Sequence, residues 1–198
     1  MDKEYLEKIL KDVSAGSISV EDAVKSLKHI HLEDIDYAHV DHHRTLRKGF
    51  PEVIFGEGKT SEQIAGIMEK MAAQEEIILV TRADKKKAES VLSRFPGAVY
   101  HEDARMIVWK KKEIPRQGRG KILVLSAGTS DIPVAKEAYI TAQAMGNDVD
   151  SVFDVGVAGI HRLFNHQKII DDASVLIVVA GMEGALPSVV AGMVSRPV

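Results

Sequence analysis

The segment 121–131, Lys-Ile-Leu-Val-Leu-Ser-Ala-Gly-Thr-Ser-Asp, constrains the fold more than any other part of this sequence. Residues 122–125 form a short apolar run, which is typical of a β-strand buried on both faces. Residues 126–130 follow with small side chains and three hydroxyl groups. Asp131 then stands where a helix N-cap is expected, and Pro133 lies close to the first helical position. A strand, a tight turn and a helix in this order gather backbone N–H groups at one point, which suits a phosphate or carboxylate.

The rest of the C-terminal part repeats this alternation of strand and helix. We expect strands at 122–126, 149–154 and 174–180, and helices at 132–145, 159–168 and 186–193. Buried strands separated by helices predict a doubly wound parallel sheet, whose ligands bind beyond the carboxyl ends of the strands. Three turns, at 126–131, 154–159 and 180–186, are then expected to meet at one edge. Because the sequence ends where a fourth strand should begin, we expect this sheet to be incomplete.

The first 40 residues are expected to form a helical arm. One amphipathic pattern contains Tyr5, Leu6, Ile9 and Leu10, and a second contains Val20, Ala23, Val24 and Leu27. Ser19 is the expected N-cap of the second helix. This pattern favours two short helices, either as an arm or as a hairpin.

Residues 41–118 are expected to form a small α/β domain. Strands are expected at 53–55, 77–80, 98–100 and 106–109, one helix at a capping box over 60–63, and another between Asp84 and Phe95. The sequence then becomes poorer in charge after a linker-like stretch at 116–121. We therefore predict a domain boundary there, with the second α/β domain at 119–198.

Composition excludes several classes of function. The chain is 45% hydrophobic and 28% charged, and its net charge of −3 gives no basic field for nucleic acid or an anionic membrane. The charged start does not resemble a signal peptide, and no apolar run is long enough to span a membrane, so we expect a cytoplasmic protein. The absence of cysteine excludes disulfides, thiolate metal sites and a cysteine nucleophile within these residues.

Two N-terminal motifs allow more than one interpretation. The segment 56–60, Gly-Glu-Gly-Lys-Thr, is not a P-loop, because Val53 stands where that motif requires glycine. A tight turn that still touches an anion through Lys59 is the better interpretation. Asp41, Arg44 and Arg47 are spaced by three residues, which predicts either an ion-paired helix end or a clamp for an anion.

The histidines give little support for a metal site. His39, His42 and His43 cluster near Asp41, but no second ligand group at helical or turn spacing accompanies them. Surface histidines are therefore the favoured interpretation, and the identity of any metal ligand stays open.

The third expected turn contains an isolated carboxylate. Glu183 lies between glycines in the segment 180–187, Ala-Gly-Met-Glu-Gly-Ala-Leu-Pro, and its neighbours are apolar or small. An acid in such a position contributes little to stability. Low polarity around it would make it a better proton acceptor near neutral pH. We therefore favour a general base over an exposed loop glutamate.

Three stretches together resemble the LarB family of nickel-pincer nucleotide cofactor biosynthesis proteins. They are 41–60, Asp-His-His-Arg-Thr-Leu-Arg-Lys-Gly-Phe-Pro-Glu-Val-Ile-Phe-Gly-Glu-Gly-Lys-Thr; 124–131 with 154–161; and 179–187. The resemblance covers nearly the whole chain. The C-terminal part is also similar to aminoimidazole ribonucleotide carboxylase, which has a flavodoxin-like sheet and forms octamers.

The resemblance implies a carboxylase that uses nicotinic acid adenine dinucleotide and CO₂ or bicarbonate. Such an enzyme adds a second carboxylate to the pyridinium ring and hydrolyses the phosphoanhydride, giving pyridinium-3,5-biscarboxylic acid mononucleotide and AMP. It implies Mg²⁺ as the cofactor, no prosthetic group and a homo-oligomer, an octamer in the family. Glu183 matches the carboxylate that removes the ring proton. The expected substrate-binding residues are Ser126, Gly128, Thr129, Ser130, Asp131, Gly156, Val157, Ala158, Gly159, Gly181, Met182 and Gly184, with possible anion contacts from Arg44, Arg47 and Lys59.

One departure from the family pattern concerns the nucleophile. The family uses a cysteine that lies beyond the Met-Glu-Gly-Ala-Leu turn, and this chain has none. The expectation is therefore an incomplete member of the family. The alternatives are a non-catalytic nucleotide-binding or assembly subunit and the purine-pathway carboxylase, which the long N-terminal part and Glu183 disfavour.

Overall fold

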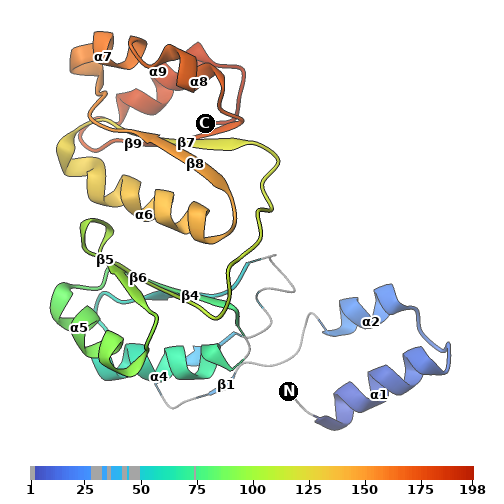
Figure 1. Ribbon diagram of the computed structural model, residues 1–198. Helices are drawn as coiled ribbons and strands as arrows, with labels where there is room; N and C mark the ends of the chain where they lie inside the picture. Colours follow the sequence, from blue (N-terminus) through green and yellow to red (C-terminus); the bar gives the residue numbers. More distant parts are fainter. Residues whose placement is uncertain (1–2, 28–32, 35–36, 42–43, 45–49, 74) are drawn as a thin grey trace.

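Two β-sheets on either side of one helix organise the molecule (Figure 1). The computed structural model describes residues 3–27, 33–34, 37–41, 44, 50–73 and 75–198. From one end to the other, the layers are two helices, a four-stranded sheet, helix α6 (Ile132–Ala144), a three-stranded sheet and three short helices. The chain therefore has the mixed α/β fold that the sequence predicts.

The first sheet combines parallel and antiparallel strands. Its order is β3 (Val53–Phe55), β4 (Ile77–Thr81), β6 (Met106–Lys110) and β5 (Val99–His101). Strands β3 and β4 are parallel, whereas β6 is antiparallel to both β4 and β5. The expected pair of strands near 98–109 is thus present.

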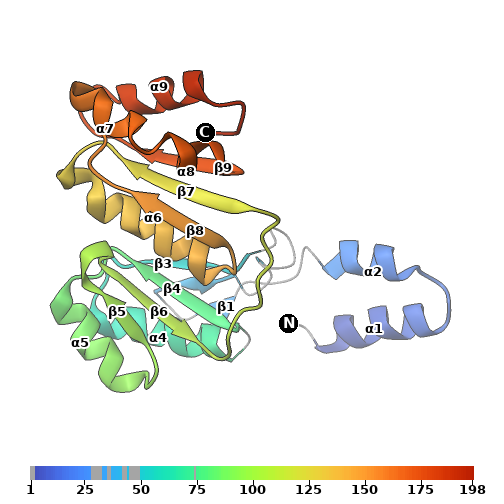
Figure 2. The same cartoon turned by 45° about the horizontal axis from the view of Figure 1, so that its top comes forward.

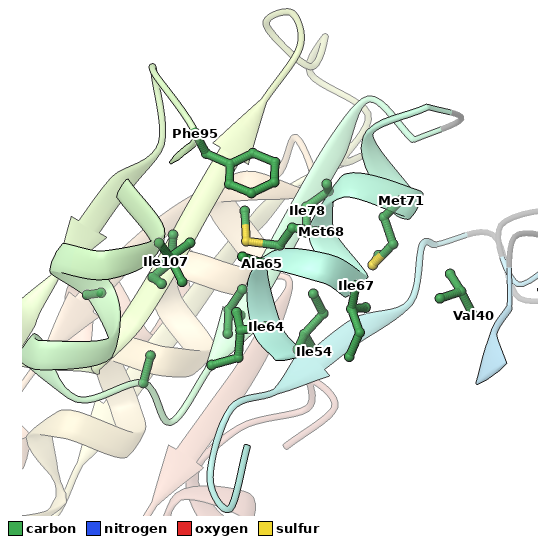
Figure 3. Packing of buried hydrophobic residues seen from close by; sticks show 14 residues of the cluster. Val40, Ile54, Ile64, Ala65, Ile67, Met68, Met71, Ile78, Phe95 and Ile107 are labelled. Carbon is green, nitrogen blue, oxygen red and sulfur yellow. The ribbon is translucent and has the colours of Figure 1, made fainter. Parts of the chain in front are cut away.

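Two helices with the expected caps cover the outer face of this sheet. Helix α4 (Ser61–Ala72) begins at a capping box, in which Gln63 N–H donates to Thr60 Oγ1 at 3.2 Å and Thr60 N–H donates to Gln63 Oε1 at 3.0 Å. Helix α5 (Lys85–Arg94) begins at Asp84, which accepts from Lys87 N–H at 2.9 Å. Figure 3 shows the buried core between α4 and the strands, which includes Ile54, Ile64, Met68, Ile78 and Ile107.

The second sheet is fully parallel and doubly wound. Its order is β8 (Asp148–Val152), β7 (Lys121–Ser126) and β9 (Val175–Val179), so the first strand in sequence lies in the centre. This second-first-third order is the start of the flavodoxin-like order. Helix α6 covers one face, and α7 (Ile160–Phe164), α8 (Gln167–Asp171) and α9 (Ala185–Met193) cover the other (Figure 1). Leu176 N–H donates to Pro197 O at 2.9 Å, so the last residues lie along the outer edge of β9.

One helix prediction in this unit is wrong. The single helix expected at 159–168 is instead a 3₁₀ turn, η3 (Val157–Gly159), followed by the separate helices α7 and α8. The break falls at the polar pair Asn165–His166, where Asn165 N–H closes the last turn of α7 on His161 O. The apolar residues Leu163 and Ile170 on either side of the break are both buried in the core. They continue one apolar pattern across the break, which explains the expectation of one helix.

Helix α6 belongs to the cores of both sheets. Ile140 and Ala144 pack with Leu79 and Met106 of the first sheet, whereas Ala135 and Ala142 pack with Val124 and Val149 of the second. The boundary predicted near residue 118 falls between β6 and β7, in a segment without helix or strand. Although the connection is irregular, the shared helix joins the two units.

The N-terminal helices pair with each other. Helix α1 (Lys3–Ser14) and helix α2 (Val20–Leu27) bury Ile9 and Ala23 between them at one side of the molecule (Figure 1). Ser19 caps α2, as predicted, by accepting from Asp22 N–H at 3.0 Å. Of the expected apolar stripes, Leu10, Val20 and Val24 are exposed. A short antiparallel pair, β1 (Glu33–Asp34) and β2 (His39–Val40), follows. No helix in the described part of the chain is long and apolar enough to cross a membrane.

Candidate functional site

Three turns meet at the carboxyl edge of the second sheet. They are the turn after β7 (residues 126–131), the turn after β8 (153–159) and the turn after β9 (180–184). All three strands are parallel, and Figure 2 shows β7 and β8 pointing towards the same edge. The structure therefore brings the three segments together at the place where doubly wound sheets bind ligands.

The first turn presents donors at the surface. Ala127 N–H donates to Val179 O of the neighbouring strand at 2.9 Å, and a 3₁₀ turn, η2 (Thr129–Asp131), leads directly into α6. Thr129 and Ser130 are both exposed. Within the described residues, neither their N–H groups nor their hydroxyls have a hydrogen-bond partner. These four donors are available to an anionic ligand.

Asp131 has a different role from the expected N-cap. Its backbone is helical, and its side chain makes no N-cap hydrogen bond to α6. Oδ2 instead accepts from Gly128 N–H at 2.9 Å, and Oδ1 accepts from Gly181 N–H at 3.0 Å. The helical segment begins three residues earlier than expected because η2 continues into α6. The Asp131 carboxylate therefore connects the first turn to the third.

Ser126 connects the first turn to the second from inside the protein. The residue is fully buried, and its Oγ accepts from Asp154 N–H at 3.3 Å while its carbonyl accepts from Val155 N–H at 3.0 Å. A Cβ atom on Gly156 would lie 2.8 Å from Ala127 O, so the close approach of these two turns requires glycine. Val157 is half-buried, Ala158 is exposed, and Gly159 is buried.

Arg162 adds a cation that the sequence did not reveal. Its Nη1 lies 2.5 Å from Asp154 Oδ2, and its guanidinium packs over Gly159, where a Cβ atom would lie 2.7 Å from Nε. Asp154 has φ = 61°, a left-handed conformation that directs the chain into the second turn. Arg162 and Asp154 are eight residues apart on different elements, so no local pattern predicts their pairing.

The third turn carries Glu183 at the surface. Gly184 N–H donates to Gly181 O at 3.0 Å, which closes residues 181–184 into a β-turn. Met182 is fully exposed and has φ = 52°, a conformation that few residues other than glycine adopt. Glu183 is exposed, and within the described residues it has no hydrogen bond or ion pair. The part of the chain that the structure describes does not form the expected apolar surroundings of this carboxylate.

The other predicted contacts lie on the first unit. Lys59 is in the turn between β3 and α4, and Arg44 lies 5.2 Å from the Phe50 ring centroid with its buried Nε unpaired in the described structure. No described hydrogen bond or ion pair links either side chain to the three turns. Arg47 and the histidines His42 and His43 lie outside the described residues. In the described part of the chain, no group of three or more His, Asp or Glu could hold a metal ion.

Comparison with known proteins identifies the family. The model of the LarB/PurE-like N-terminal domain matches residues 32–112, which span the first sheet. An uncharacterized protein of Methanocaldococcus jannaschii is 40% identical over 191 residues, covering 92% of this chain and 75% of the relative. The chain belongs to the LarB-like family. This LarB-like membership relates the chain to carboxylases and agrees with the flavodoxin-like second sheet.

Proposed function

We propose that this LarB-like chain binds nicotinic acid adenine dinucleotide and carries the proton acceptor for carboxylation of its pyridinium ring. The observation that carries the proposal is the hydrogen bond from Gly181 N–H to Asp131 Oδ1, at 3.0 Å. This bond holds the turn with the unpaired Glu183 carboxylate against the turn with the free donors of Thr129 and Ser130. A nucleotide anchored on one turn would therefore have its ring within reach of an acid on the other.

In this proposal, each turn has a separate task. The N–H groups and hydroxyls of Thr129 and Ser130 bind a phosphate, because they are exposed donors at a helical start. Ser126 supports the second turn from its buried position. Gly156, Val157, Ala158 and Gly159, with Gly181, Met182 and Gly184, line the edge where the nicotinate ring would lie.

Glu183 would act at the carbon that receives CO₂. Carboxylation forms a new C–C bond at a ring carbon and releases the proton from that carbon, which the Glu183 carboxylate accepts. The pyridinium ring is electron-poor, so it needs a nucleophile to add first and make the neighbouring carbon reactive. These 198 residues contain no cysteine. We therefore propose that these residues bind the nucleotide and remove the proton, and that none of them is the nucleophile.

Mg²⁺ fits the site only as a partner of the substrate phosphates. Both oxygens of Asp131 accept N–H groups, and Asp154 is paired with Arg162, so each of these carboxylates already has partners within the chain. Mg²⁺ commonly binds through substrate phosphates, water and one or two protein oxygens. The hydroxyls of Thr129 and Ser130 would be the nearest oxygens of this chain. When bound, the ion would neutralise charge that develops as water cleaves the phosphoanhydride to release AMP.

A homo-oligomer is part of the same proposal. Met182 and Val134 are exposed apolar side chains at or next to the three turns. Burial between subunits would remove them from water and supply the apolar surroundings that Glu183 lacks in one chain. Light scattering after size-exclusion chromatography would measure the assembly, and a strictly monomeric protein would contradict this part.

The substitution Glu183→Gln, made in the full-length protein, tests the catalytic assignment. It removes the proton acceptor and preserves size, so we expect incorporation of labelled bicarbonate into the dinucleotide product to fall at least about 100-fold, a typical loss for a general base. Calorimetry should show dinucleotide affinity within about threefold of wild type, because Glu183 holds no phosphate. Glu89→Gln, at an exposed position of α5, is the matched control and should leave both values unchanged.

The same two measurements separate the proposal from its alternative. Binding of the dinucleotide without label incorporation by the full-length wild-type protein would favour a non-catalytic nucleotide-binding subunit. Unchanged turnover of Glu183→Gln would remove Glu183 from its role. An absence of binding would contradict both functions.

A further inference from the structure

We propose that Asp131 is a positioning residue, whose carboxylate holds the nucleotide turn (126–131) and the Glu183 turn (180–184) together through two hydrogen bonds, which we call the clasp. This inference rests on the proposed function and deepens it. The two hydrogen bonds of Asp131 go to backbone N–H groups that are 53 residues apart in the chain, on Gly128 and Gly181. One carboxylate is thus shared between two segments that otherwise belong to different βα connections.

Both acceptor oxygens of Asp131 are used inside the protein. Oδ2 and Oδ1 accept at 2.9 and 3.0 Å, within the ordinary range for N–H···O hydrogen bonds. A Cβ atom at Gly181 would lie 3.1 Å from Oδ1, so glycine at this position lets the carboxylate approach the backbone. Both bonds are charge-assisted, so the carboxylate holds the two turns more firmly than a neutral acceptor would. The geometry therefore gives Asp131 a positioning role, in which its carboxylate fixes the third turn relative to the first.

The third turn needs such a restraint. Met182 has φ = 52° and is fully exposed, so neither its own backbone preference nor packing within the chain favours this conformation. The turn is held at its end by Gly184 N–H to Gly181 O, at 3.0 Å, and at its start by Gly181 N–H to Asp131. Among the described residues, Asp131 is the one side chain that hydrogen-bonds to residues 180–184. Loss of the Asp131 carboxylate would remove this restraint on the third turn. The Glu183 side chain would then no longer be held in one direction.

Amide hydrogen exchange of Asp131→Asn tests the clasp without requiring turnover. The amide retains one acceptor oxygen and places an NH₂ group against an N–H donor, so at least one of the two bonds must break. We expect exchange at Gly181 or Gly128 to accelerate about tenfold, the change expected for loss of one hydrogen bond. Asp131→Ala should accelerate both. The amide of Ala127, which donates to Val179 O, is the internal reference and should not change.

Asp150→Asn is the matched control. Asp150 lies on β8 and pairs with Lys121 Nζ at 2.5 Å, so this variant removes a carboxylate from the same sheet without affecting the turns. Its Gly128 and Gly181 amides should exchange at the wild-type rate. Wild-type exchange at both glycines in Asp131→Asn, or equal acceleration in Asp150→Asn, would overturn the clasp.

A kinetic comparison on the full protein separates positioning from binding. A positioning role predicts that Asp131→Asn lowers kcat about tenfold or more while KM and dinucleotide affinity stay within about twofold. Weakened binding with unchanged kcat would show that Asp131 contacts substrate and would overturn the inference. If the wild-type protein does not carboxylate the dinucleotide, the proposed function fails, and the exchange measurements still decide whether the clasp exists.

Discussion

Ser126 and Asp131 stand at the two ends of one turn, and both act mainly on other parts of the protein. The sequence predicted a tight turn here, because small residues stand between an apolar strand and a helix start. It could not reveal that the Ser126 hydroxyl faces Asp154 or that Asp131 reaches Gly181. Those partners come from other strands, and their proximity depends on the sheet order β8-β7-β9.

Arg162 and Met182 show the same limit of prediction from sequence. The Arg162–Asp154 pair depends on the position of α7 next to the second turn, and the left-handed backbone of Met182 has no marker in its own side chain. By contrast, the position of Glu183 at a strand end was predictable from the glycines on either side. The exposure of the Glu183 side chain was not predictable, because the apolar composition of a segment does not determine which way one side chain points.

At the residue scale, His101 should make stability depend on pH. Partial burial lowers the pKa of its imidazole, and the nearby positive charge of Lys110 lowers this pKa further. Both residues line a cavity of about 350 Å³ at the edge of β5 and β6. The unfolded state therefore binds a proton at His101 more readily than the folded state does. The free energy of unfolding should fall as pH decreases from about 7 through the lowered pKa.

Urea unfolding of His101→Gln at pH 7.5 and pH 5 measures this contribution. The variant should lose less stability than wild type between the two pH values, because carboxylates titrate alike in both proteins. His166→Gln is the control, since His166 is exposed between α7 and α8. An identical pH dependence in wild type and His101→Gln would contradict the assignment.

At the element scale, helices and strands with their own local signals were predicted well. The capping box at Thr60, the cap at Asp84 and the strand pair β5–β6 all formed as expected. The helix expected at 159–168 did not, because Leu163 and Ile170 continue one apolar pattern across a break at Asn165–His166. Apolar periodicity alone does not distinguish one helix from two that pack on the same core.

Thr60→Ala should destabilise the protein through the start of α4. The substitution removes the Oγ1 acceptor of Gln63 N–H, and an N-cap of this type contributes about 1 kcal/mol. Chemical denaturation should show that loss, and Thr60→Ser should restore most of it because serine keeps the acceptor. Ser61→Ala, one residue into the helix, should have a smaller effect. Equal stability of Thr60→Ala and wild type would show that the capping box at Thr60 does not contribute to the free energy of unfolding.

At the scale of the whole molecule, the two sheets should unfold together. The charge change near residue 118 suggested two separate domains, and the connecting segment is indeed irregular. However, α6 packs on both sheets, and ion pairs from Arg82 to Glu137 and from Asp103 to Lys136 add polar contacts across the junction. Apolar residues on opposite faces of one helix do not reveal which sheets they will meet.

Ile140→Ala tests this coupling. Ile140 is 8% exposed and contacts the first sheet from a helix of the second unit, so its truncation should cost about 2–4 kcal/mol. Fluorescence of Trp109, the single tryptophan, reports on β6, and far-ultraviolet circular dichroism reports on the whole chain. Both signals should shift to the same lower midpoint. Gln143→Ala, at an exposed position of α6, should stay within about 0.5 kcal/mol of wild type.

Two separate transitions, with the Trp109 midpoint unchanged in Ile140→Ala, would contradict a shared core. Coincident transitions would support treating the two units as one cooperative structure.

Helix α6 also limits how sequences with this architecture can diverge. Only Pro133, Val134 and Gln143 of its thirteen residues are exposed, so most positions face one sheet or the other, and Tyr139 packs against both cores. A replacement that improves the fit to one sheet disturbs the other unless a second change compensates. Helix α6 should therefore tolerate fewer substitutions than α4 and α5, which pack in the core of the first sheet alone.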